Sequence, residues 1–222
     1  MWRAFKPSVP AAIVLAVTLL VPVTSVAEEL DFSPGSIGVI GCSNTAQHVD
    51  AYLPISGRAL LANVGNLGGG TLARWYANEG DYWEKYDKRA PVEGYGATWI
   101  QICLRATENP EGIFTATHVG WIRGVVAEVR QRFGNIPIFV SPLNFYEGAE
   151  GCLATGPRGQ AVTVEVADWA AANLGVFRGP DTGPMDVDQL ASDGCHLNAS
   201  GQTEAGRQLV RFFDSGTRSR ER

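Results

Sequence analysis

The chain has 222 residues, of which 45% are hydrophobic and 18% are charged, and its formal net charge at pH 7 is −5. This length suits one compact domain with a substantial core, and the composition excludes a disordered or fibrous protein. The acidic balance gives no electrostatic footprint for nucleic acid or for an anionic membrane, so we expect a neutral or weakly charged substrate.

The first residues have the layout of a secretory signal peptide. Arg3 and Lys6 make the start positive, residues 11–23 are apolar, and small residues at 25–27 suit a signal peptidase. We therefore predict a signal peptide over 1–27 and a secreted or periplasmic mature protein. An uncleaved membrane anchor is the alternative, although the apolar run is short for a membrane span.

The remainder is interpreted as a linker over 28–35, one domain over 36–214 and a charged tail over 215–222. Cleavage would remove two basic residues and no acidic ones, which moves the formal charge from −5 to −7. No second apolar run is long enough to cross a membrane, so we expect no stable membrane insertion after cleavage. The sequence leaves the oligomeric state open.

Short apolar runs then alternate with stretches of helical periodicity, which is typical of a parallel sheet covered by helices on both faces. The predicted strands cover 37–40, 59–64, 98–104, 136–140 and 176–177. The predicted helices cover 119–133, 162–174 and 200–213, and a shorter helix follows the turn at 41–44.

Residues 74–95 combine charged side chains with six aromatic ones: Trp75, Tyr76, Tyr82, Trp83, Tyr86 and Tyr95. Aromatic rings with polar groups at this density can line a sugar or acyl pocket, and Trp75 and Tyr82 are candidate substrate-binding residues. An amphipathic helix that packs its rings on the core would give the same pattern. The sequence does not decide between the two.

The polar signals fall at predicted carboxyl ends of strands, where open parallel sheets bind their ligands. Ser43 follows the first strand at a strand-to-helix turn, which would expose its hydroxyl. Near the C-terminus, Asp193 stands three residues before His196, so the carboxylate could orient the imidazole and the imidazole could take the serine proton. Each signal alone is weak. Their order along the chain, with the glycine cluster at 65–70 between them, indicates catalysis.

This order resembles the SGNH (GDSL-like) hydrolase superfamily over nearly the whole mature chain. The family's Gly-Asp-Ser motif corresponds to 41–43, its glycine loop to 63–71 and its Asp-x-x-His motif to Asp193 and His196. The resemblance makes Gly69 the candidate donor of a backbone N–H to the oxyanion. It implies a three-layer α/β/α flavodoxin-like fold, with a parallel sheet of about five strands in the order 2-1-3-4-5. It also implies ester hydrolysis, often on a carbohydrate or lipid.

Two positions depart from the family pattern. The third family motif carries an Asn that completes the oxyanion hole, and the alignment places Arg105 there instead. The Arg105 guanidinium could donate hydrogen bonds to the oxyanion and stabilise its charge. Alternatively, Arg105 could bind a carboxylate of the substrate, or it could form a structural ion pair with an Asp. Cys42 replaces the family's Asp before the nucleophile, where the side chain should point away from the cleft.

All four cysteines fall near predicted strand ends on the catalytic side. A Cys152–Cys195 disulfide would fasten the loop that carries His196 and so help to fix its geometry. Cys42 and Cys103 end neighbouring strands in the implied order, so they could form a second bridge. Spacing alone leaves three pairings open, and a catalytic cysteine is a further alternative.

Asn144, which follows the fourth predicted strand, is a third candidate substrate-binding residue. His48 and His118 fall on predicted helices away from strand ends and are interpreted as structural. We expect no cofactor and no metal.

The sequence therefore predicts a serine esterase that acts through an acyl-serine, with short acyl (O-acetyl) esters of extracellular carbohydrates as the preferred substrates. An O-acyltransferase that uses the same residues and a degenerate hydrolase that only binds glycan are the alternatives.

Overall fold

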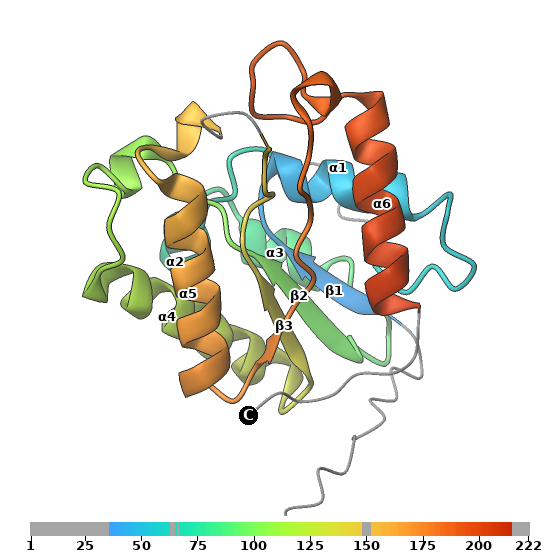
Figure 1. The fold of residues 1–222 in the computed structure, drawn as a ribbon. Coiled ribbons are helices and arrows are strands. Elements are labelled where there is room, and N and C mark those ends of the chain that lie inside the picture. The colour runs from blue at the N-terminus through green and yellow to red at the C-terminus, as the bar shows by residue number, and fades with distance from the viewer. Residues whose placement is uncertain (1–35, 63–64, 66, 148–151, 215–222) are drawn as a thin grey trace, which may run out of the picture.

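The computed structural model describes four stretches of the chain: residues 36–62, 65, 67–147 and 152–214 (Figure 1). The predicted signal peptide, linker and tail lie outside these residues. No helix in the described stretches is long and apolar enough to cross a membrane.

A parallel sheet of four strands, in the order β1-β2-β3-β4, forms the centre of the molecule. The strands are β1 (Ile37–Ile40), β2 (Ala97–Gln101), β3 (Ile138–Ser141) and β4 (Phe177–Arg178). Every residue of β1, β2 and β3 is buried. Strands that are buried on both faces need nearly continuous apolar runs, which is the pattern that these segments show in the sequence.

The strand predicted over 59–64 is not a regular strand, so the expectation of five strands was wrong within the described residues. Leu61 makes a single parallel bridge to Ile37, at the outer edge of β1. The Ile37 N–H donates to Leu60 O, and the Ala62 N–H donates to Ile37 O. Ala59 has a φ of +45°, a left-handed conformation that interrupts the extended chain at this point.

Helices cover both faces of the sheet, giving an α/β fold in layers (Figure 1). On one face, α1 (Ser43–Tyr52) packs against α6 (Ala199–Phe213), and on the other, α4 (Ala116–Phe133) packs against α5 (Gly159–Asn173). The shorter α2 (Leu72–Ala77) lies against α4 and is followed by α3 (Tyr82–Asp87). Single 3-10 turns are η1 (Ala106–Glu108), η2 (Leu153–Thr155) and η3 (Val187–Gln189).

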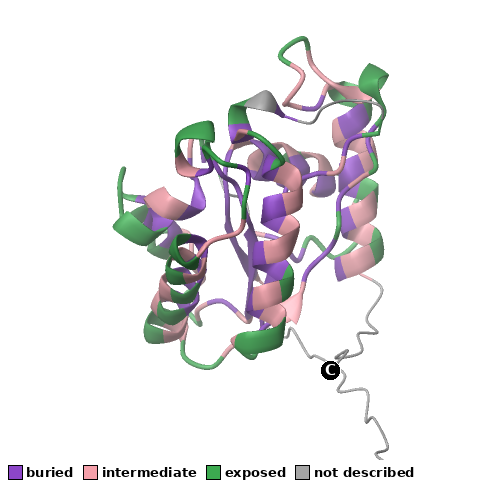
Figure 2. Cartoon of the chain, turned by 60° about the vertical axis from the view of Figure 1, so that its left-hand side comes forward, coloured by how far each residue is buried: buried purple, intermediate pink, exposed green. Residues whose placement is uncertain are grey.

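The core lies between the sheet and the inward faces of these helices, as the purple segments of Figure 2 show. Trp99, Phe139 and Phe213 are among its largest fully buried side chains. The approach of α6 to α1 is so close that a Cβ at Gly206 would lie 2.7 Å from the backbone of Ala51. A side chain at position 206 would therefore push the two helices apart.

His48 on α1 belongs to this core. Its ring is completely buried beside Trp99, with the ring centroids 6.4 Å apart, and neither ring nitrogen has a hydrogen-bond partner. Burial penalises the charged imidazolium and lowers the pKa of His48 to about 3. Burial also lowers the pKa of His118, whose Nδ1 faces the start of α4 at Thr115. Both histidines hold structural positions.

The buried His48 is expected to make the fold sensitive to acid. Below its unfolded-state pKa of 6.5, the unfolded chain binds a proton that the folded chain does not accept until about pH 3. The free energy of unfolding should therefore fall with pH across this window, by up to about 1.4 kcal/mol per pH unit from this group. Urea unfolding of wild type and His48→Leu between pH 7.5 and 4 measures the effect. The variant should show the shallower dependence, and equal slopes would contradict the prediction.

Candidate active site

Three side chains predicted to act together meet at the carboxyl end of the sheet. The Ser43 Oγ lies 2.8 Å from His196 Nε2, although the two residues are 153 positions apart in the chain. On the other side of the ring, His196 Nδ1 lies 2.6 Å from Asp193 Oδ2. The hydroxyl, the imidazole and the carboxylate thus form one continuous hydrogen-bonded line.

The turn that holds Asp193 also fixes the direction of its carboxylate. Oδ1 accepts the backbone N–H of Cys195 at 3.0 Å and that of His196 at 2.9 Å, which leaves Oδ2 for the imidazole. The hydrogen bond from His196, followed by these two backbone bonds, lowers the pKa of Asp193 to about 2. An ionised Asp193 favours a proton on Nδ1, so Nε2 is left to accept from the Ser43 hydroxyl.

Ser43 is the first residue of α1, directly after Cys42, which is extended. No hydrogen-bond acceptor in the described residues takes its backbone N–H. Free N–H groups at a helix start favour negative charge. The side chain that would attack a carbonyl and an N–H that could hold the resulting oxyanion therefore come from the same residue.

The glycine loop is pressed against the turn that carries Ser43. A Cβ at Gly70 would lie 2.3 Å from Gly41 O, so only glycine permits this approach. Gly69 has a φ of +71°, and in the described part of the chain its N–H has no acceptor. Beyond the loop, the Leu72 N–H donates to Cys103 O at 2.8 Å. The loop thus lies between the Ser43 turn and the end of β2.

Arg105 reaches the same loop from the end of β2. A Cβ at Gly69 would lie 2.9 Å from Arg105 Nη2 and 2.8 Å from Arg74 Nη1. Arg74 donates to Gly69 O and pairs with Glu79. Arg105 is exposed, and no carboxylate among the described residues lies within 4.0 Å of its guanidinium. Among the described residues, Arg105 therefore does not form the structural ion pair that was one of the alternatives for it.

The rings of Trp75 and Tyr82 belong to the core, so the structure does not support their prediction as substrate-binding residues. Both are buried, and their rings stack with centroids 5.0 Å apart. Trp75 Nε1 donates to Gly41 O at 2.9 Å, and the Tyr82 hydroxyl donates to Gly68 O at 2.9 Å. The segment therefore packs its rings on the core, as the alternative interpretation predicted, and it does so as two short helices. The hydrogen bonds of Trp75 and Tyr82 hold the Ser43 turn and the glycine loop in place.

Asn144 is also completely buried, so the structure does not support its prediction as a substrate-binding residue. Its side-chain oxygen accepts from Gln101 Nε2 at 3.1 Å and from the Thr182 hydroxyl at 2.9 Å. Sequence reasoning interpreted Gln101 only as part of a strand. A polar residue inside an otherwise apolar strand is the signal that would have drawn attention to this buried polar cluster.

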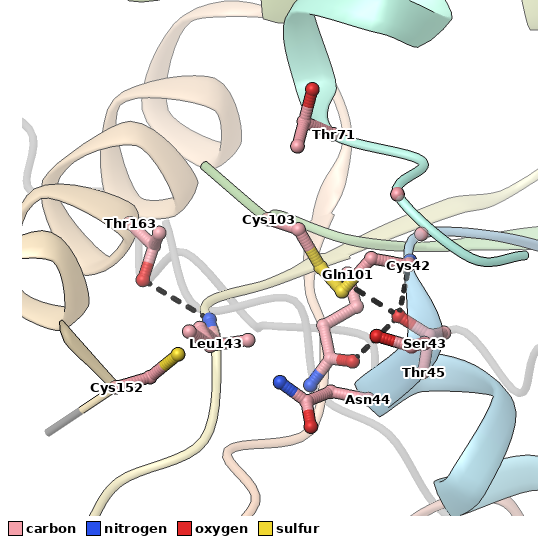
Figure 3. The surroundings of a disulfide bond; sticks show 12 residues. Cys42, Ser43, Asn44, Thr45, Thr71, Gln101, Cys103, Leu143, Cys152 and Thr163 are labelled. Atoms are coloured by element: carbon pink, nitrogen blue, oxygen red, sulfur yellow. Dashed lines mark hydrogen bonds between the residues drawn. A yellow bond between two sulfur atoms is a disulfide. The ribbon is translucent and has the colours of Figure 1, made fainter. Parts of the chain in front are cut away.

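Both predicted disulfides are present, Cys42–Cys103 and Cys152–Cys195. The first ties the residue before Ser43 to the end of β2 (Figure 3), and the second ties the residue before His196 to the start of η2. No cysteine is free, so a catalytic cysteine is excluded. Each disulfide fixes one loop of the candidate site to the scaffold.

Acyl transfer through a serine requires three kinds of group. They are a hydroxyl hydrogen-bonded to an imidazole, a carboxylate on the other side of the ring, and unpaired N–H donors beside the hydroxyl. The described residues bring all three together.

Comparisons of the chain with family models, with curated proteins and with solved structures found no match in any of the three.

Proposed function

We propose that the protein is a serine ester hydrolase of the SGNH type that acts through an acyl-serine intermediate. The observation that carries the proposal is the line from the Ser43 hydroxyl to His196 (2.8 Å) and on to Asp193 (2.6 Å). The bridge between Leu61 and Ile37 supports the family assignment, because it puts the segment after α1 at the edge of β1. That edge is where the order 2-1-3-4-5 has its second strand.

In the first half of the reaction, Ser43 Oγ attacks the carbonyl carbon of the ester while its proton passes to His196 Nε2. Asp193, which remains ionised, stabilises the imidazolium that forms. When the tetrahedral intermediate collapses, the bond to the alcohol oxygen breaks and His196 returns the proton to that oxygen. In the second half, a water molecule gives its proton to His196 and attacks the acyl-serine. The acid is released, and Ser43 recovers its proton.

The negative charge on the carbonyl oxygen would be held by the backbone N–H groups of Ser43 and Gly69, neither of which has an acceptor among the described residues. One such donor typically lowers the barrier by roughly 3 kcal/mol. Arg105 would add a permanent positive charge next to Gly69, in place of the family's Asn.

We propose short acyl esters, such as O-acetyl groups on extracellular carbohydrates, as the substrates. The acidic mature chain and the predicted export support this class, and two disulfides are typical of exported proteins. The aromatic rings of Trp75 and Tyr82 no longer support it, since they are buried. An O-acyltransferase would share every group of the site and would differ in needing an acceptor. Acetate release with and without an oligosaccharide acceptor distinguishes the two.

A fluorophosphonate probe tests the proposal directly, because it reacts far faster with an activated serine than with an ordinary hydroxyl. Wild type should be labelled on the peptide that contains Ser43, and Ser43→Ala should lose both labelling and ester hydrolysis. Ser192→Ala is the matched control, since Ser192 is exposed in the same loop as Asp193 and should leave labelling unchanged. Absence of labelling in folded wild type, or labelling that survives in Ser43→Ala, would refute the esterase and favour a protein that only binds glycan.

A further inference from the structure

The imidazole of His196 reaches Ser43 only if two separate segments keep a fixed distance: α1, which begins at Ser43, and the loop that carries His196. Neither disulfide joins these two segments, since each ties only one of them to the scaffold. Hydrogen bonds connect the two segments instead, and they involve the residues that precede and follow His196 in the sequence.

On the C-terminal side of His196, the side chain of Gln47 binds the backbone of Leu197. Gln47 stands four residues after Ser43 and so lies one helical turn along α1. Its Nε2 donates to Leu197 O at 3.2 Å, and its Oε1 accepts the Leu197 N–H at 3.1 Å. Two hydrogen bonds from one amide fix both the distance and the orientation of the peptide next to His196.

The contact on the N-terminal side is made by Tyr146, whose hydroxyl donates to Cys195 O at 2.8 Å. The same hydroxyl accepts from Asn144 Nδ2 at 3.5 Å. Burial raises the pKa of Tyr146 to about 12, so the hydroxyl keeps the proton that it donates. The peptide that precedes His196 is thereby held to a side chain in the core.

From Asn144 the hydrogen bonds continue back to the start of α1. Gln101 Nε2 donates to Asn144 Oδ1 at 3.1 Å, and Gln101 Oε1 accepts from the Thr45 hydroxyl at 2.8 Å. Thr45 in turn accepts the backbone N–H of Cys42 at 3.0 Å. Figure 3 shows Thr45 and Gln101 pointing toward one another beside the Cys42–Cys103 disulfide. The side chains of Thr45, Gln101 and Asn144 are all buried.

These five hydrogen bonds form one series, and each group in it donates to the next. The series begins at the Cys42 N–H and ends at the Cys195 carbonyl. Hydrogen bonds aligned in series polarise one another and strengthen, and the low dielectric of the interior increases their individual strength. A buried chain of this kind keeps the spacing between its two ends, which are the residue before Ser43 and the residue before His196.

We propose that Gln47 and Tyr146 are positioning residues for the catalytic pair: they hold the peptides on either side of His196 at the distance from α1 that lets its Nε2 accept the Ser43 proton. This inference rests on the proposed serine esterase function. It adds the residues that maintain the geometry on which that function depends.

The test compares Gln47→Ala and Tyr146→Phe with wild type in hydrolysis of p-nitrophenyl acetate and in the rate of fluorophosphonate labelling. Because misplacement of a reacting group by about 1 Å can cost roughly 100-fold in rate, we expect each variant to lower kcat about 10- to 100-fold with KM unchanged. In a His196→Ala background the same substitutions should have no further effect, because they act through the imidazole. A residue that only stabilised the fold would lower activity in both backgrounds.

Gln202→Ala is the matched control, because Gln202 Nε2 donates to the same Leu197 O, at 2.9 Å, but from α6 rather than from α1. Its kcat should stay near that of wild type. An equal loss in Gln202→Ala, or wild-type labelling rates in Gln47→Ala and Tyr146→Phe, would overturn the positioning role while leaving the esterase intact. Failure of wild type itself to label would count against the proposed function instead.

Discussion

Replacing His196 by alanine is expected to lower kcat for ester hydrolysis at least about 1,000-fold, because Ser43 then has no base within reach of its proton. The free energy of unfolding should change by less than about 1 kcal/mol, since the side chain is partly exposed and its contacts are with Ser43 and Asp193. Asp193→Asn keeps the shape but no longer holds the imidazole in the required tautomer, so we expect a loss of roughly 1,000-fold or more. Initial rates and urea unfolding curves on the same preparations measure both quantities.

His118→Gln provides the opposite control. His118 is buried on α4, and its loss should lower stability while leaving kcat near wild type. If activity and stability fell together in His196→Ala, His196 would be a structural residue and the catalytic assignment would not stand.

Reduction of the two disulfides is expected to have the largest effect on stability. They close loops with sequence separations of 61 and 43 residues. In the chain-entropy model, each loop of this size contributes about 4 kcal/mol by restricting the unfolded chain. Loss of both would thus remove about 8 kcal/mol, which is comparable with the whole stability of a typical domain. The reduced protein should unfold in little or no urea and lose its activity, as measured by circular dichroism and ester hydrolysis with and without a phosphine reductant.

Paired substitutions separate the two bridges. Cys152→Ala with Cys195→Ala should retain part of the stability through Cys42–Cys103, and a variant that lacks all four cysteines should not respond to the reductant at all. Four free thiols detected in a native, fully active preparation would show that the bridges are not needed.

Most of the fold could be predicted because its helices and strands bury apolar residues at regular spacings in the sequence. The helices predicted over 119–133, 162–174 and 200–213 differ by no more than three residues at either end from α4, α5 and α6. The strand predicted over 59–64 failed for a physical reason. Its apolar residues do lie against β1, but the left-handed Ala59 leaves room for one bridge only.

The meeting of Ser43, Asp193 and His196 could be predicted because their residue types, order and spacing match what a proton relay requires. The direction in which a side chain points after a strand is decided by tertiary packing, and for this reason Asn144, Trp75 and Tyr82 were assigned to a pocket although they are buried. Residues such as Gln47 and Tyr146 leave no local signal, because they bond to the backbone of a distant loop.

The exposure of the loop that carries His196 has a consequence for the proposed reaction. The side chains of His196 and Asp193 are 36% and 51% exposed, so one edge of the imidazole is open to bulk solvent. In the part of the chain that the structure describes, water can therefore reach the ring of His196 directly from the surface. Under the proposed function, an exposed base would favour attack by water on the acyl-serine, so the acyl group would end on water rather than on a second sugar.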